Sequence, residues 1–143
     1  MDQSLQILGL AKKAALIIVG LDDVCRAVRI KNLSLIISAS DASDRAKRRA
    51  DDVADYCGAV YAQVPYTMQE LGAMTGRGSP GTIAFLEPGL AARFLRGLAT
   101  EQPDEFLEKA EHLEQEAIAI KNMATKKQNK TAKHSGGNGR AAV

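Results

Sequence analysis

The sequence predicts an α/β fold in which helices cover both faces of a four-stranded mixed sheet, forming a three-layer α/β/α sandwich. Short β-branched runs alternate with segments whose apolar residues recur at helical spacing, and this alternation implies crossover connections. Hydrophobic residues make up 45% of the chain and aromatic residues only 4%, so Leu, Ile, Val and Ala must build most of the core. A length of 143 residues gives room for one domain with one core.

The first three predicted elements are a helix, a strand and a second helix. Ser4 can cap the first helix. Its apolar residues recur at helical spacing, at Leu5, Leu8, Ala11 and Ala15. Residues 16–19 are a short apolar run that ends at Gly20, which predicts a buried strand. The second helix begins directly after this glycine, where two acidic residues stabilise the positive, N-terminal end of a helix.

A strand, a helix and another strand are predicted for the middle of the chain. Residues 33–39 are mostly apolar and predict the second strand, whereas residues 40–44 have turn and cap chemistry. A helix follows over residues 45–57, with small apolar residues on its inner face and basic residues mostly outside, and Gly58 ends it. Residues 59–64 predict the third strand.

A capping box identifies the next helix. Thr67 and Glu70 have the spacing of that motif, and the short helix that they open ends at Gly76. Residues 77–81 are rich in glycine and predict a loop. Residues 82–86 predict the fourth strand, which completes the sheet.

Two further helices and a tail complete the chain. Pro88 opens one helix, and Pro103 opens an amphipathic helix that is expected to end near residue 123. Residues 101–116 carry one Lys and seven acidic residues, whereas residues 117–143 carry six Lys or Arg and no acid. We therefore divide the chain into a folded body (1–99), an acidic amphipathic helix (100–124) and a disordered basic tail (125–143).

The sequence contains no motif of a common enzyme class. Neither His112 nor His134 has partners at metal-ligand spacing, and neither do the two cysteines, Cys25 and Cys57. No nucleophile elbow, phosphate-binding loop or dinucleotide fingerprint is present. No apolar run is long enough to span a bilayer, and the N-terminus lacks the features of a signal peptide. We therefore expect a cytoplasmic monomer without catalytic residues, metal or cofactor.

A series of short motifs resembles the kink-turn-binding ribosomal protein superfamily of the L-seven-Ae type. The motifs are Leu8-Gly9-Leu10-Ala11, Gly20-x-Asp22-Asp23-Val24-x-Arg26, Ser40-Asp41-Ala42-Ser43, Glu70-Leu71-Gly72, Gly76-Arg77 and Gly89-Leu90-Ala91. Their order and spacing carry the resemblance, which covers about residues 5–98 and is greatest to the bacterial YlxQ-type branch. It implies an α/β/α sandwich that binds RNA, is not an enzyme, and associates with the ribosome or with structured RNA.

The resemblance also implies which residues contact RNA. The family pattern after the first strand is basic, Gly, x, Asn, Glu, x, x, Lys. In this chain Gly20 matches the glycine, Asp22 falls on the Asn, Asp23 on the Glu and Arg26 on the Lys, while Val19 stands at the basic position. An ionised Asp22 can accept but not donate a hydrogen bond, so it cannot donate to a guanine edge as an amide does.

A second loop falls where the family closes over an extruded base, and it contains Arg77, Gly78, Ser79 and Pro80. The resemblance therefore implies an RNA-binding surface composed of residues from both loops. The expected RNA-contacting residues are Gly20, Leu21, Asp22, Asp23, Arg26, Arg77, Ser79 and Pro80.

Simpler interpretations of these residues stay open. Residues 20–26 are also what a helix start requires, and the basic residues of 45–49 are typical of a solvated helix face. The alternative function is a protein-interaction module that docks a partner through the helix at 103–123. An exposed apolar stripe on that helix would favour the partner. A continuous basic patch would favour RNA, and it would join Lys12, Lys13, Arg26, Arg29 and Arg77.

Overall fold

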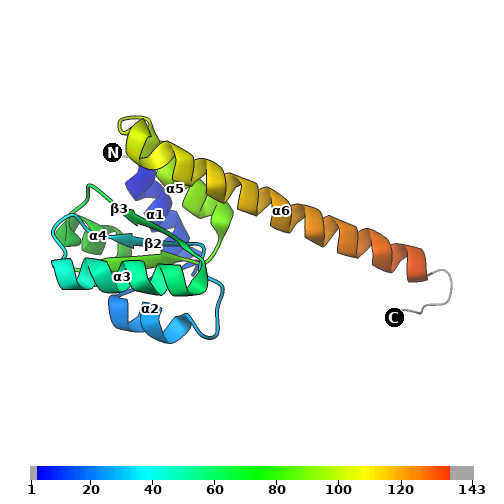
Figure 1. Cartoon of the computed structure of the whole chain (residues 1–143), viewed down its shortest axis with the longest axis horizontal. Coiled ribbons are helices and arrows are strands. Elements are labelled where there is room, and N and C mark those ends of the chain that lie inside the picture. The colour runs from blue at the N-terminus through cyan, green and yellow to red at the C-terminus, as the bar shows by residue number, and fades with distance from the viewer. Residues whose placement is uncertain (1–2, 136–143) are drawn as a thin grey trace.

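The computed structural model describes the backbone of residues 3–135 and the side chains of residues 3–123. Over these residues the chain folds into the predicted sandwich of helices and a sheet (Figure 1). The helices are α1 (Gln3–Lys13), α2 (Leu21–Ala27), α3 (Asp44–Cys57), α4 (Met68–Thr75), α5 (Pro88–Ala99) and α6 (Pro103–Ser135). The strands are β1 (Ile17–Val19), β2 (Leu35–Ser38), β3 (Val60–Gln63) and β4 (Thr82–Phe85).

The sheet is mixed, as predicted, and its strand order is β1-β4-β2-β3. β4 runs antiparallel to both of its neighbours. Its Ile83 lies opposite Val19 of β1, and its Phe85 lies opposite Leu35 of β2. β2 and β3 are parallel and are joined through α3, which is the crossover that the alternating sequence pattern predicts. Fully buried positions run the length of β2 and β4, because helices cover the sheet on both sides.

Successive residues of each strand face opposite helix layers. Ile37 and Ile83 pack into a core with α1, α4, α5 and α6, whereas Ile36 and Ala84 pack into a second core with α2 and α3. Figure 1 shows α3 and α2 below the sheet and α1 and α5 above it. The three-layer arrangement therefore follows from the side-chain period of two along buried strands.

Several predicted helix ends are confirmed. Thr67 and Glu70 form the reciprocal capping box of α4, with the Thr67 hydroxyl accepting from the Glu70 N–H at 3.1 Å. Gly58 and Gly76 end their helices at positive φ, of 77° and 70°. Ser4 differs from expectation, because α1 already begins at Gln3. Ser4 is buried and its hydroxyl donates to the Phe94 carbonyl at 2.8 Å, which fastens α1 to α5.

Helix α6 is longer than predicted. It continues past residue 123 to Ser135, because no Pro or Gly interrupts the chain between Pro103 and Gly136 and the intervening Ala, Lys and Gln residues favour helix. The backbone of residues 125–135, which were expected to be disordered, is therefore helical, and the rest of the predicted tail lies outside the described residues. Within residues 3–135, every helix is too short or too polar to cross a bilayer.

The first half of α6 belongs to the core of the body. Phe106, Ala110 and Leu113 are buried in the same cluster as the residues of α1 and α5. Arg96 of α5 donates two hydrogen bonds to the Glu114 carboxylate, at 3.0 and 2.6 Å, so part of the acidic block serves to hold α6 in place. Glu116, Ala117 and Ile120 still line a groove with residues of the body, and further along α6 extends away from it (Figure 1).

We expect Phe106→Ala to lower the free energy of unfolding by about 3–5 kcal/mol, because it leaves a cavity in the core. Ile118→Ala on the same helix is the matched control, since Ile118 is 51% exposed whereas Phe106 is 1% exposed. Urea denaturation of the full chain measures both. Equal, small losses would mean that α6 is an appendage and that the body is complete at residue 99.

Candidate nucleic-acid interface

The two loops of the predicted site meet at one end of the sheet. β1 and β4 are antiparallel neighbours, so the residues that follow β1 lie beside those that precede β4. The Gly20 N–H donates to the Thr82 carbonyl at 2.8 Å and fixes this contact. The structure therefore brings together residues 20–26 and 76–81, as the predicted site requires.

The chain turns sharply between β1 and α2. Gly20 has φ of 105°, which favours glycine, and it is the N-cap of α2 without a side-chain hydrogen bond. Val24 and Ala27 are buried, Val24 in the core against the sheet, and this burial orients the short helix. Asp22 and Arg26 consequently face solvent, on the outer side of α2.

The second loop folds back tightly on α4. A Cβ atom on Gly72 would lie 1.6 Å from the carbonyl oxygen of Gly78, so only glycine at position 72 permits this approach. Pro80 is buried beneath the loop, whereas Arg77 and Ser79 are exposed. Of the residues predicted to contact RNA in this loop, Arg77 and Ser79 are accessible, and Pro80 supports the loop from beneath.

Asp23 connects the two loops. Its carboxylate accepts from the Arg26 guanidinium at 2.5 Å and from the Arg77 guanidinium at 3.5 Å. The hydrogen bond from Arg26 is the main cause that lowers the pKa of Asp23, with a further contribution from Arg77. The same pairing raises the pKa of Arg26. The side chains of Arg26 and Arg77 remain 75% and 55% exposed, so these pairs contribute little to folding stability and instead position two cations.

Other basic residues are placed only partly as predicted. Arg29 and Arg49 lie near Arg26, because α2 and α3 cross in the same layer. The sequence leaves open whether the basic residues of 45–49 share a side with Arg26, because the contact depends on how two separate helices pack, and the structure places Arg49 there. Lys12 and Lys13 lie at the C-terminal end of α1, which precedes β1 and packs on the opposite face of the sheet. They are therefore not part of this cluster.

Within the described residues no three His, Cys, Asp or Glu side chains gather as metal ligands would.

Comparisons with known proteins identify the fold. The sequence matches no family model and no curated protein. Among solved structures, a protein of unknown function from Bacillus halodurans is similar, with a TM-score of 0.62 and 25% identity over 68% of this chain and 97% of that one. A Giardia lamblia 15.5 kD RNA-binding protein is similar with a TM-score of 0.53 and 14% identity, over 69% of this chain and 84% of that one.

We expect Gly72→Ala to lower the free energy of unfolding by about 1–3 kcal/mol, because the new methyl group displaces the backbone of the second loop. Helix propensity alone predicts the opposite, a gain of about 1 kcal/mol. Gly9→Ala in α1 is the matched control, since its Cβ would lie 3.2 Å from the flexible end of Met74 and 4.0 Å from the Met74 carbonyl oxygen, which is an ordinary contact. Urea denaturation of both variants decides between these effects, and a more stable Gly72→Ala would contradict the close approach.

Proposed function

We propose that this chain binds structured RNA through the surface formed by residues 20–26 and 76–81, here called the two-loop surface, and that it has no catalytic activity. One observation carries the proposal: Arg26 of α2 and Arg77 of the loop after α4 meet at Asp23 with their guanidinium groups exposed. The similarity of the fold to a Giardia RNA-binding protein supports it. The resemblance of residues 5–98 to the kink-turn-binding superfamily, described above, supports it further.

The chemistry of the two-loop surface suits a folded nucleic acid. Two guanidinium groups on one side bind phosphate oxygens and orient the backbone. The exposed loop that carries Arg77 also carries Ser79, and it can contact an unpaired base beside the two guanidinium groups. RNA that bends sharply offers both features together, so a kink-turn is the ligand class that we propose, in the ribosome or in another structured RNA.

The alternative, a partner docked on the apolar stripe of α6, is not supported by the packing. Phe106, Ala110 and Leu113 are buried within this chain, so the first half of the stripe is covered, whereas Ile118, Ile120 and Met123 further along α6 are exposed. Glu114 of the same segment is paired with Arg96. We therefore assign this half of α6 to the core and the RNA contact to the two-loop surface.

We expect Asp22→Asn to tighten binding to a kink-turn RNA by about 1–3 kcal/mol, because it replaces an exposed carboxylate with an amide that can donate to a base edge. We expect Arg26→Glu to weaken binding to every RNA, because its partner is phosphate. Titrations of wild type and both variants against a kink-turn and a plain duplex, at one salt concentration, measure these effects.

The two RNAs separate charge from base recognition. Removal of a negative charge alone strengthens binding to both RNAs, whereas a base contact strengthens binding to the kink-turn only. If neither substitution changes either affinity, the two-loop surface is not the RNA-binding site.

A further inference from the structure

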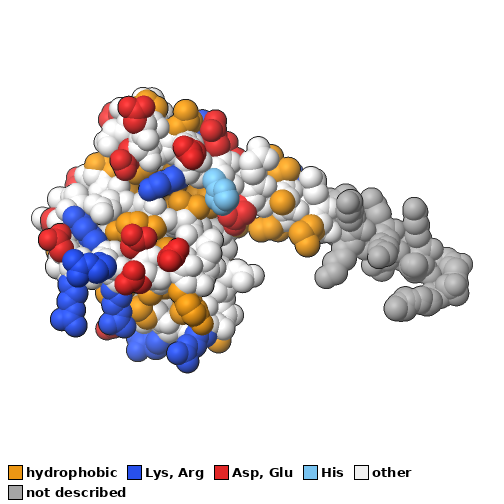
Figure 2. All heavy atoms as spheres, viewed as in Figure 1, with side chains coloured by type: hydrophobic (Ala, Val, Ile, Leu, Met, Phe, Trp, Pro, Cys, Tyr) orange, Lys and Arg blue, Asp and Glu red, His pale blue; other side chains and the backbone are white. Residues whose placement is uncertain are grey.

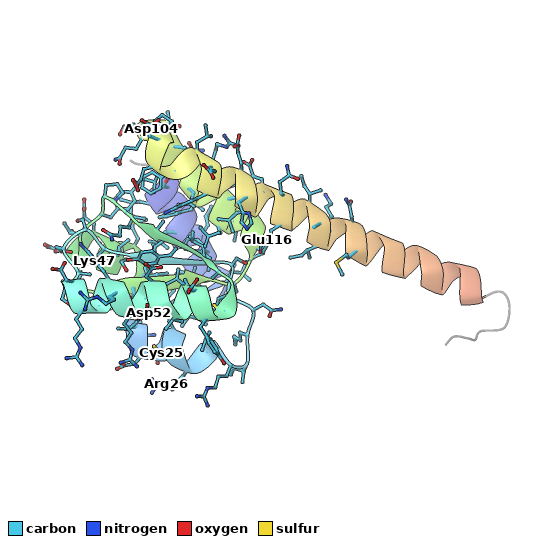
Figure 3. The ribbon with its side chains drawn as sticks, viewed as in Figure 1. Cys25, Arg26, Lys47, Asp52, Asp104 and Glu116 are labelled. Atoms are coloured by element: carbon cyan, nitrogen blue, oxygen red, sulfur yellow. The ribbon has the colours of Figure 1, made fainter. Side chains whose placement is uncertain are left out.

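A basic hollow lies beside the two-loop surface, between α2 and α3. It has a volume of about 520 Å³ and is lined by Asp22, Cys25, Arg26, Arg29 and Arg49. Three guanidinium groups and one carboxylate give this surface a formal charge of +2. Figure 2 shows Lys and Arg side chains gathered over the first turns of α3 and around α2, and Figure 3 places Cys25 and Arg26 on α2 below α3.

The packing of the two helices on the sheet creates the hollow. α2 buries Val24, and α3 buries Ala50 and Ala54, all in the core on this face of the sheet. The small side chains of α3 hold that helix close to the strands, and Arg49, next to Ala50, is left exposed. Burial of one face of each helix therefore sets their basic side chains around a common depression.

Two of the three arginines are available to a ligand. Within residues 3–123, neither Arg29 nor Arg49 forms an ion pair, whereas Arg26 is paired with Asp23. Both are exposed, so the protein itself does not neutralise them. Unpaired guanidinium groups in one depression present several donors in fixed planes, a geometry that matches phosphate oxygens.

We propose that this hollow binds the phosphate backbone of a double-helical RNA stem that extends from the two-loop surface. The inference rests on the proposed function. It specifies that the RNA is double-helical next to the loop or kink that the two-loop surface binds. Continuity supports it, because Asp22, Cys25 and Arg26 belong to both surfaces. The hollow is shallow and its charges are spread over two helices, which suits a continuous backbone better than a single small anion. A stem that follows α2 past Arg26 meets Arg29 and Arg49 next.

The two cysteines provide a footprint with an internal control. Cys25 lines the hollow, and Cys57 lines a separate groove at the end of α3. Both are free thiols and partly exposed. The experiment measures the rate of N-ethylmaleimide labelling of each thiol in the full chain, with and without a kink-turn RNA that carries a long stem. With free RNA at about ten times its Kd, mass action predicts labelling of Cys25 about tenfold slower and labelling of Cys57 unchanged.

Salt dependence tests the arginines themselves. The double variant Arg29→Gln/Arg49→Gln should flatten the slope of log affinity against log salt by about 2, since each lost phosphate contact removes close to one unit. Arg48→Gln/Arg93→Gln removes the same charge at exposed positions that do not line the hollow, and it should leave the slope nearly unchanged. Thermal unfolding of both variants confirms that they are folded.

The outcomes separate this inference from the proposed function. If Arg77→Gln weakens RNA binding while Cys25 stays fully reactive in the complex and the salt slope is unchanged in Arg29→Gln/Arg49→Gln, the hollow is not a stem contact although the two-loop surface binds RNA. If no RNA binds the wild-type chain, both fail. Cys25 also lies within residues 20–26, so its protection reports on both surfaces, and only protection of Cys25 together with the flatter slope supports the stem contact.

Discussion

The antiparallel pairing of β1 with β4 is the constraint on which the candidate interface depends. Because the strands run in opposite directions, the end of one and the start of the other share an end of the sheet. Asp23 and Arg77, which are 54 positions apart in sequence, thereby come within hydrogen-bond distance. The buried faces of β1 and β4 fix the register, since a slip by one residue would turn Ile83 and Phe85 into the wrong helix layer.

The charges at this end of the sheet are arranged by packing rather than by ion pairing. Asp23 lies between two arginines, but all three groups are substantially exposed, so they add little to folding stability. Their positions follow from apolar contacts beneath them: Val24 holds α2 on the sheet, and the Gly72 contact holds the second loop. The surface is therefore largely formed before any ligand arrives, which reduces the entropic cost of binding.

Local rules predicted most of the fold. Short, largely apolar runs predicted the four strands, the Thr67–Glu70 pair predicted the start of α4, and Gly58 and Gly76 predicted the ends of their helices, because each feature depends on neighbours in sequence. Long-range contacts could not be predicted in this way. The bond from Ser4 to Phe94, the burial of Phe106 and the position of Arg49 beside α2 all depend on how distant elements pack. Only the family resemblance indicated that both loops contact RNA. That the two loops touch each other is known only from the pairing of β1 with β4.

The central claim is that the two loops bind one RNA together, and backbone amide chemical shifts test it most directly. The ¹⁵N-labelled full chain would be titrated with a kink-turn RNA and, separately, with a plain duplex. If both loops bind one RNA, the amides of residues 20–26 and 76–81 shift in the kink-turn titration and reach saturation at the same RNA concentration. Shifts confined to one loop, or to α6 alone, would contradict it.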